Sequence, residues 1–225
     1  MRRFVCNQTN KNYNRLFVGL LTKLRDAYEA GLDLASTLRT YLLSLTGPAV
    51  YWPEDDEFKQ GWLRRPIYVN SRSDRAAMLL RAMEEALRTP RNEAISIPDR
   101  LTVEHLLPQS ADPLVYPYAT DPPLQIGETR ELRRQSLMHT IGNLTLLTGP
   151  LNSSISNGAF RDKSKAIGYE SDLRLNADFR GAPVGSWSEA DILSLGAARF
   201  KLAISIWPHP ARVVTDQLAV SAQAA

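Results

Sequence analysis

The stretch of residues 102–109, Thr-Val-Glu-His-Leu-Leu-Pro-Gln, most constrains how this chain can fold. Its apolar residues predict a short strand. Pro108 predicts that the strand ends in a turn, because proline lacks an amide donor and pushes the residue before it toward extended geometry. Neighbouring residues on a strand point to opposite faces, so Glu104 and His105 can serve one site only where the strand ends or twists. We therefore expect His105 to lie on a bend, with its side chain exposed and aimed.

A second apolar segment, residues 141–148, gives the clearest strand signal in the chain. It ends at a Gly-Pro pair, and a helix is expected to begin near residue 151 or 152. Between the two strands, residues 110–127 are proline-rich and have no regular period. This pattern predicts a long irregular loop, of the kind that is often functional or mobile.

Helical periodicity governs most of the remaining sequence. The expected helices cover residues 15–30, 33–45, 73–88, 128–138, 159–169 and 188–207, and another begins at the acidic run 54–57. Residues 3–6 are strand-like instead. In the helix 73–88, which Pro90 ends, the side chains expected to face inward are Met78, Leu79, Ala82, Met83 and Leu87. The sequence thus predicts a mostly helical α+β domain around a strand–strand–helix unit.

Composition excludes several classes of site and partner. The single cysteine, Cys6, rules out a disulfide framework and a thiolate zinc site. No apolar run approaches the roughly 18 residues of a membrane span, so we expect a soluble, cytoplasmic protein without a membrane partner. Cations gather in residues 1–25 and 64–91, which suits a polyanion; surface arginines such as Arg72 or Arg75 would contact phosphate if they lie on the DNA face. Solvated helix faces are the alternative reading of these cations.

Three side chains carry chemistry that suits one site. The imidazole of His105 can accept a proton near neutral pH. The carboxylate of Glu104 is a hard oxygen donor that suits Mg²⁺ or Mn²⁺. Asn152 offers a neutral amide oxygen at the start of the expected helix.

These segments resemble the HNH, or ββα-metal, nucleases. Within that group the chain is similar to the C-terminal nuclease domain of GmrSD-type modification-dependent restriction enzymes, and to the nuclease half of phosphorothioate-sensing antiphage proteins. The positions that carry the resemblance are residues 104–109, residues 141–147, Asn152, Asn157, Phe160, Lys163, Tyr169 and Ser171. The resemblance implies three parts: a helical N-terminal part of a fragment (1–100), the HNH core (101–172), and a C-terminal helix and tail that pack on the same domain (173–225).

The resemblance also implies a role for each residue. His105 is the expected general base, and Glu104 before it is the expected metal ligand. Asn143 is expected to fix the histidine ring or to brace the loop. Asn152 is expected to complete a Mg²⁺ or Mn²⁺ site, and Lys163 to contact phosphate.

The chain departs from the common HNH pattern, and some alternatives stay open. The helix has no histidine ligand, and the acid is Glu where Asp is commoner, so water and substrate phosphate must complete the metal shell. Asn143 could simply form a turn, Asn152 could cap a helix, and Lys163 could be solvated. His139 and His209 show no partner pattern and are expected to be structural or exposed.

The function that this resemblance implies is metal-dependent DNA cleavage by an effector domain of a bacterial defence protein. A single HNH site cuts one strand per event, so nicking is expected. The resemblance implies a further partner, an N-terminal nucleotide-hydrolysing sensor domain. A catalytically silent DNA-binding module and an RNA-directed HNH nuclease are the alternatives.

Overall fold

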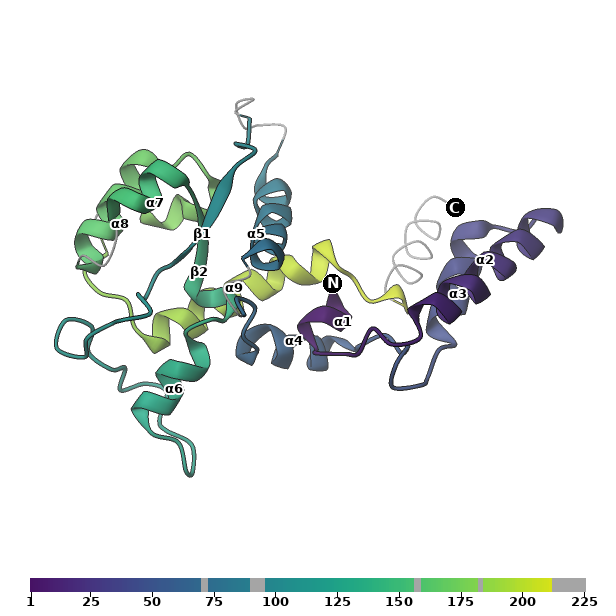
Figure 1. Ribbon diagram of the computed structural model, residues 1–225, viewed down its shortest axis with the longest axis horizontal. Coiled ribbons are helices and arrows are strands. Elements are labelled where there is room, and N and C mark those ends of the chain that lie inside the picture. The colour runs from purple at the N-terminus through teal and green to yellow at the C-terminus, as the bar shows by residue number, and fades with distance from the viewer. Residues whose placement is uncertain (70–72, 90–95, 156–158, 182–183, 212–225) are drawn as a thin grey trace, which may run out of the picture. The chain divides into compact units, whose positions relative to one another are not determined.

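The computed structural model describes residues 1–69, 73–89, 96–155, 159–181 and 184–211 (Figure 1). Arg72, Pro90 and Asn157 lie outside these residues. Contacts divide the chain into two compact units, Met1–Gly61 with Trp207–Ala225, and Trp62–Ile206. This division follows packing, whereas the boundaries at residues 101 and 172 follow the motif and remain a prediction.

The first unit is helical. It contains α1 (Arg2–Val5), α2 (Tyr13–Glu29), α3 (Leu34–Leu43) and the start of α4 (Asp55–Arg64). The strand expected at residues 3–6 is wrong, because this segment is the short helix α1. The guanidinium of Arg2 donates from Nε to the carbonyl of Trp207 at 2.7 Å and from Nη1 to that of Pro53 at 3.0 Å. These long-range contacts override the local strand preference.

The helices α2 and α3 begin and end close to where the sequence predicts. Gly31 follows α2 with a φ of +68°, a conformation that favours glycine. Asp33 caps α3, since its Oδ2 accepts a hydrogen bond from the Ser36 amide at 2.6 Å.

The second unit is organised around a two-stranded antiparallel sheet of β1 (Leu101–His105) and β2 (Leu144–Thr148). His105 pairs with Leu144, so the end of β1 lies beside the start of β2. The second strand begins later than predicted, because residues 141–143 form the 3-10 helix η1 (Ile141–Asn143). The predominantly helical α+β class is confirmed.

Figure 1 shows α5 (Asp74–Leu87) on one side of this sheet, and α7 (Gly149–Ile155) and α8 (Phe160–Glu170) on the other. The second unit also contains α6 (Arg130–Leu137), η2 (Arg174–Phe179) and α9 (Glu189–Ile206), and α6 packs against α9. The helix η2 was not predicted. In α5, Met78 and Leu87 are exposed rather than inward, while Leu80 is fully buried. No helix among the described residues is both long and apolar enough to cross a membrane.

Helix α9 holds η1 in place. The fully buried guanidinium of Arg199 donates to the carbonyls of Ile141 at 2.6 Å and Leu144 at 2.5 Å. The backbone of Gly142 lies so close to α9 that an added Cβ would come within 2.1 Å of the Ile192 carbonyl oxygen. Only glycine therefore allows this approach, and Asn143 follows directly.

We predict that Gly142→Ala destabilises the second unit, because the clash is with backbone and one of the two segments must move. Overpacking of this kind costs roughly 1–3 kcal/mol or more. Gly149→Ala is the matched control, since nothing lies within 4 Å of a Cβ added there. Denaturant titration of both variants checks the prediction, and equal unfolding midpoints for the two would contradict it.

Candidate active site

The turn after β1 is fixed by the side chain of Asn143, which is fully buried. Its Oδ1 accepts a hydrogen bond from the Leu107 amide at 2.7 Å. Its Nδ2 donates to the carbonyls of Leu107 at 3.0 Å and Met138 at 2.9 Å. Its backbone carbonyl accepts from the Leu106 amide at 2.8 Å. These contacts are those of a residue that braces the loop, and they fix the two residues that follow His105.

His105 ends the strand, as predicted, but its side chain is only 6% exposed, where an exposed one was expected. Its Nε2 lies 3.0 Å from Nδ1 of His139. The ring of Tyr68 packs edge-on against His105 with centroids 4.9 Å apart, and stacks on His139 at 5.9 Å. The carbonyl of His139 accepts from the Tyr68 amide at 3.3 Å, which holds these segments together. The His105 side chain at the end of β1 is therefore covered by the rings of Tyr68 and His139 instead of facing solvent.

Burial sets the charge of this histidine. Desolvation, with smaller contributions from nearby His139 and Lys163, lowers the pKa of His105 from 6.5 to about 4. Burial also lowers the pKa of His139. At neutral pH the imidazole of His105 is therefore uncharged, and a general base must be in this form.

Glu104 and Lys163 form an ion pair. The Lys163 side chain is buried, and its Nζ also donates to the His105 carbonyl at 2.5 Å. Burial lowers the pKa of Lys163, and the Glu104 carboxylate opposes that shift. The alternative of a solvated lysine is therefore wrong. Lys163 comes from α8 and brings the third segment of the motif to the Glu-His pair.

Asn152 lies on α7 and contacts another part of β1. It is the fourth residue of α7, so it does not cap that helix. Its Nδ2 donates to the hydroxyl of Thr102 at 2.9 Å. Thr102 and Glu104 are two residues apart on β1 and share a face, with a spacing of about 7 Å. The structure thus brings Asn152 to the face that carries Glu104, but to a different residue on it.

The residues near His105 offer an incomplete metal shell. Among the described residues, no group of three or more His, Cys, Asp or Glu side chains is placed to hold a metal ion. Glu104 and Asn152 present oxygen donors, which suit Mg²⁺ or Mn²⁺ rather than zinc. This donor set fits a hard divalent ion if water or phosphate supplies the remaining ligands.

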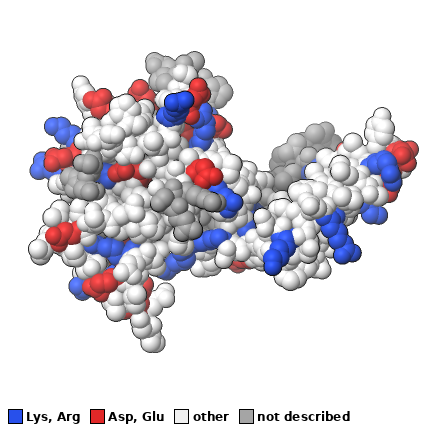
Figure 2. Space-filling view, in the orientation of Figure 1, with Lys and Arg blue, Asp and Glu red and all other residues white. Residues whose placement is uncertain are grey.

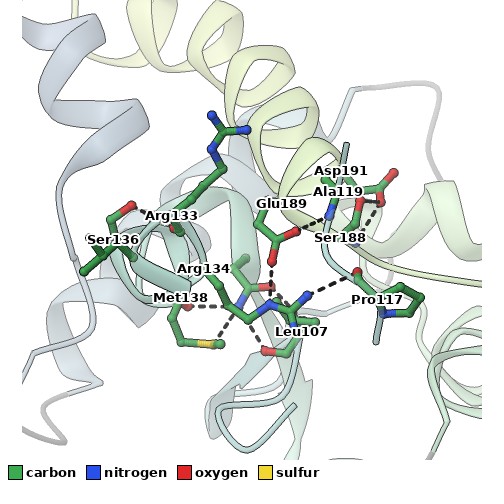
Figure 3. A network of polar contacts seen from close by, with 12 residues as sticks. Leu107, Pro117, Ala119, Arg133, Arg134, Ser136, Met138, Ser188, Glu189 and Asp191 are labelled. Atoms are coloured by element: carbon green, nitrogen blue, oxygen red, sulfur yellow. Dashed lines mark hydrogen bonds and ion pairs between the residues drawn. The ribbon is translucent and has the colours of Figure 1, made fainter. Parts of the chain in front are cut away.

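The proline-rich loop 110–127 is tied to helices by buried charges (Figure 3). Arg134 on α6 forms an ion pair with Glu189 on α9 and donates to the Pro117 carbonyl at 3.2 Å. The other carboxylate oxygen of Glu189 accepts from the Ala119 amide at 2.8 Å. The loop that follows the Glu-His strand is therefore held by hydrogen bonds with both α6 and α9.

The sequence did not identify His139 and Tyr68 as parts of the site. His139 was read as structural or exposed, and it contacts His105 directly. The one available signal was position, since His139 stands four residues before Asn143 and the strand that follows pairs with the Glu-His strand. Nothing in the local pattern marks Tyr68.

The basic stretches contribute less to an open surface than expected. Arg2 and Arg3 are buried and bind backbone carbonyls. Arg81 on α5 and Arg88 directly after it pair with glutamates of that helix. Figure 2 shows positive and negative side chains interspersed over the visible face of the second unit. Part of the positive charge therefore serves packing and local pairing.

The comparison with protein families gives a match over most of the chain. The model for "GmrSD restriction endonucleases, C-terminal domain" matches residues 52–198. This range includes both strands, α7, α8 and most of α9. No curated protein and no solved structure matches the chain.

We predict that acid weakens this unit through His105. The folded pKa of about 4 lies below the unfolded value of 6.5, so the unfolded chain binds the proton first as pH falls. The contribution of His105 to the free energy of unfolding is complete above pH 6.5 and is lost as the pH falls from 6.5 to 4. At 1.36 kcal/mol per pKa unit this contribution is about 3 kcal/mol.

The measurement is denaturant unfolding of the wild type and of His105→Asn at pH 7, 6, 5 and 4. The wild type should lose more stability than the variant, which cannot titrate at this position. Parallel curves for the two proteins across this range would exclude the assignment.

Proposed function

Because this chain belongs to the family of GmrSD restriction endonuclease C-terminal domains, we propose that residues 101–172 form an HNH-type nuclease site that cuts DNA with His105 as general base. A nuclease of restriction systems is what the family supports. The observation that carries the finer proposal is the buried imidazole of His105 at the end of β1, directly before the turn that Asn143 fixes.

The chemistry follows from the residues in place. Neutral His105 takes a proton from a water molecule, which then attacks phosphorus in line with the leaving oxygen. General base catalysis of this kind contributes roughly 10²–10⁴-fold. Asn143 holds the backbone after His105 and so keeps the imidazole in position.

Glu104 and Asn152 are the proposed holders of Mg²⁺ or Mn²⁺. When bound, such an ion neutralises charge on the phosphate and stabilises the leaving oxygen. In the structure the Glu104 carboxylate is paired with Lys163. We propose that Lys163 balances this carboxylate in the free protein and turns to the phosphate once the carboxylate is engaged by metal.

We propose that this nuclease acts in the cytoplasm as part of bacterial defence. A lone HNH site acts on one strand at a time, so we propose nicking rather than concerted double-strand cleavage. The sensing of DNA modification, such as phosphorothioation, is assigned to an N-terminal nucleotide-hydrolysing domain as partner.

We predict that His105→Ala abolishes cleavage and leaves DNA affinity nearly unchanged, because the imidazole activates water and does not hold phosphate. The assay is conversion of supercoiled plasmid to open circles with Mg²⁺ or Mn²⁺, with RNA as a parallel substrate. His209→Ala is the matched control, since His209 pairs with Glu54 in the first unit.

If His105→Ala cleaves at more than about a tenth of the wild-type rate, His105 is not the general base. Binding without open-circle product by the wild type would favour the silent DNA-binding module, and cleavage of RNA alone would redirect the proposal to RNA.

We predict that excess EDTA stops cleavage and that Glu104→Gln raises the Mg²⁺ concentration needed for half-maximal rate by tenfold or more, as expected for loss of about 1.4 kcal/mol or more of ligand binding. Glu170→Gln, at an exposed position of α8, is the control for the same chemical change. Full activity in EDTA would overturn the metal-dependent mechanism.

A further inference from the structure

His105 is the middle member of a chain of polar groups. On one side its Nε2 faces Nδ1 of His139 at 3.0 Å. On the other side its Nδ1 faces the side-chain amide of Gln109 at 3.5 Å. The first distance is that of a full hydrogen bond between ring nitrogens, and the second is long for one. The two nitrogens of His105 are therefore held unequally.

The hydrogen bonds among Gln109, His105 and His139 are consistent with one placement of the hydrogens. A neutral imidazole has one N–H donor and one bare acceptor nitrogen. The Gln109 atom that faces the ring is Nε2, which can only donate, so Nδ1 of His105 is the acceptor and Nε2 of His105 carries the hydrogen. That hydrogen points to Nδ1 of His139, which must then be bare, with the His139 hydrogen on Nε2. The chain begins at Gln109, which is exposed, and ends at His139, which is partly exposed.

We propose that His139 is a positioning residue for the nuclease reaction: by accepting the Nε2 hydrogen of His105, it fixes the tautomer that leaves Nδ1 of His105 as the atom that receives the proton of water. Tyr68 supports this arrangement, since its ring contacts both imidazoles and its amide bonds the His139 carbonyl. The proton transfer from water rests on the proposed nuclease function, whereas the tautomer of His105 does not.

The weaker contact has a role in the same scheme. The Gln109 amide lies where a donor to Nδ1 must lie, and it is held there only at 3.5 Å. A water molecule that enters with the substrate replaces it at low cost. The water O–H bond then breaks, its proton binds Nδ1, and the oxygen electron pair forms the bond to phosphorus while the leaving oxygen departs with the electron pair of its own bond. The imidazolium so formed keeps its hydrogen bond from Nε2 to Nδ1 of His139. This bond becomes stronger, because its donor is now charged.

The test is an NMR spectrum of the ¹⁵N-labelled full chain at neutral pH, read through the couplings between ring protons and ring nitrogens. Bare and protonated imidazole nitrogens have well-separated ¹⁵N shifts. The chain has three histidines, so His209→Ala and His139→Asn identify the ring of His105 by elimination. The expected spectrum shows His105 with bare Nδ1 and protonated Nε2, and His139 with bare Nδ1. A His105 ring protonated at Nδ1 would overturn the proposal.

Two substitutions separate positioning from packing. His139→Asn keeps an acceptor oxygen near the place of Nδ1, whereas His139→Leu has similar bulk and no acceptor. We expect the slowly exchanging Nε2 proton of His105 to persist in the Asn variant and to disappear in the Leu variant. On DNA, kcat should fall by roughly 10²-fold in the Leu variant, with KM unchanged and the Asn variant restoring most of the rate.

The outcomes distinguish the inference from the function on which it builds. The expected tautomer in a protein that cuts no DNA would leave the His105–His139 assignment standing and would remove the proposed function. Cleavage at full rate by the Leu variant, with the Nε2 proton retained, would remove His139 from the mechanism and leave the general base in place.

Discussion

The structure around the site depends on one buried amide. Asn143 satisfies both backbone groups of Leu107 and the carbonyl of Met138, so a single side chain joins the end of β1, the end of α6 and the start of β2. Each of these backbone groups is buried, and leaving one unpaired costs about 1–3 kcal/mol. A hydrophobic residue of the same size could fill the volume but could not supply the donors and the acceptor. Asn143 thus fixes where the chain turns and, with it, where His105 lies.

The rest of the second unit keeps that amide in place. Arg199 donates from α9 to one carbonyl of η1 and to the first carbonyl of β2, and Gly142 lets α9 approach η1 closely. Arg134 and Glu189 join α6, α9 and the proline-rich loop by a buried ion pair. Removing one partner of such a pair leaves an uncompensated charge, so these contacts specify a single arrangement. The long helices therefore act chiefly as a frame for a sheet of only two strands.

Local signals in the sequence were enough to predict the strand–strand–helix unit, the helix bounds within a few residues and the end of β1 at His105. They were not enough where tertiary contacts decide. Residues 3–6 are strand-like by composition and form a helix because Arg2 binds distant carbonyls. His105 is buried because Tyr68 and His139 converge on it from separate segments. Lys163 is buried because its cation meets Glu104. Such meetings between residues far apart in sequence leave no periodic trace in either segment.

The Glu104–Lys163 pair has a consequence for how the domain folds. A partly buried carboxylate without a counter-charge would oppose folding, because its negative charge would be left uncompensated. Here the chain carries its own cation to that carboxylate. The charge of Glu104 is therefore balanced in the folded chain by a residue of the chain itself, 59 positions further along the sequence.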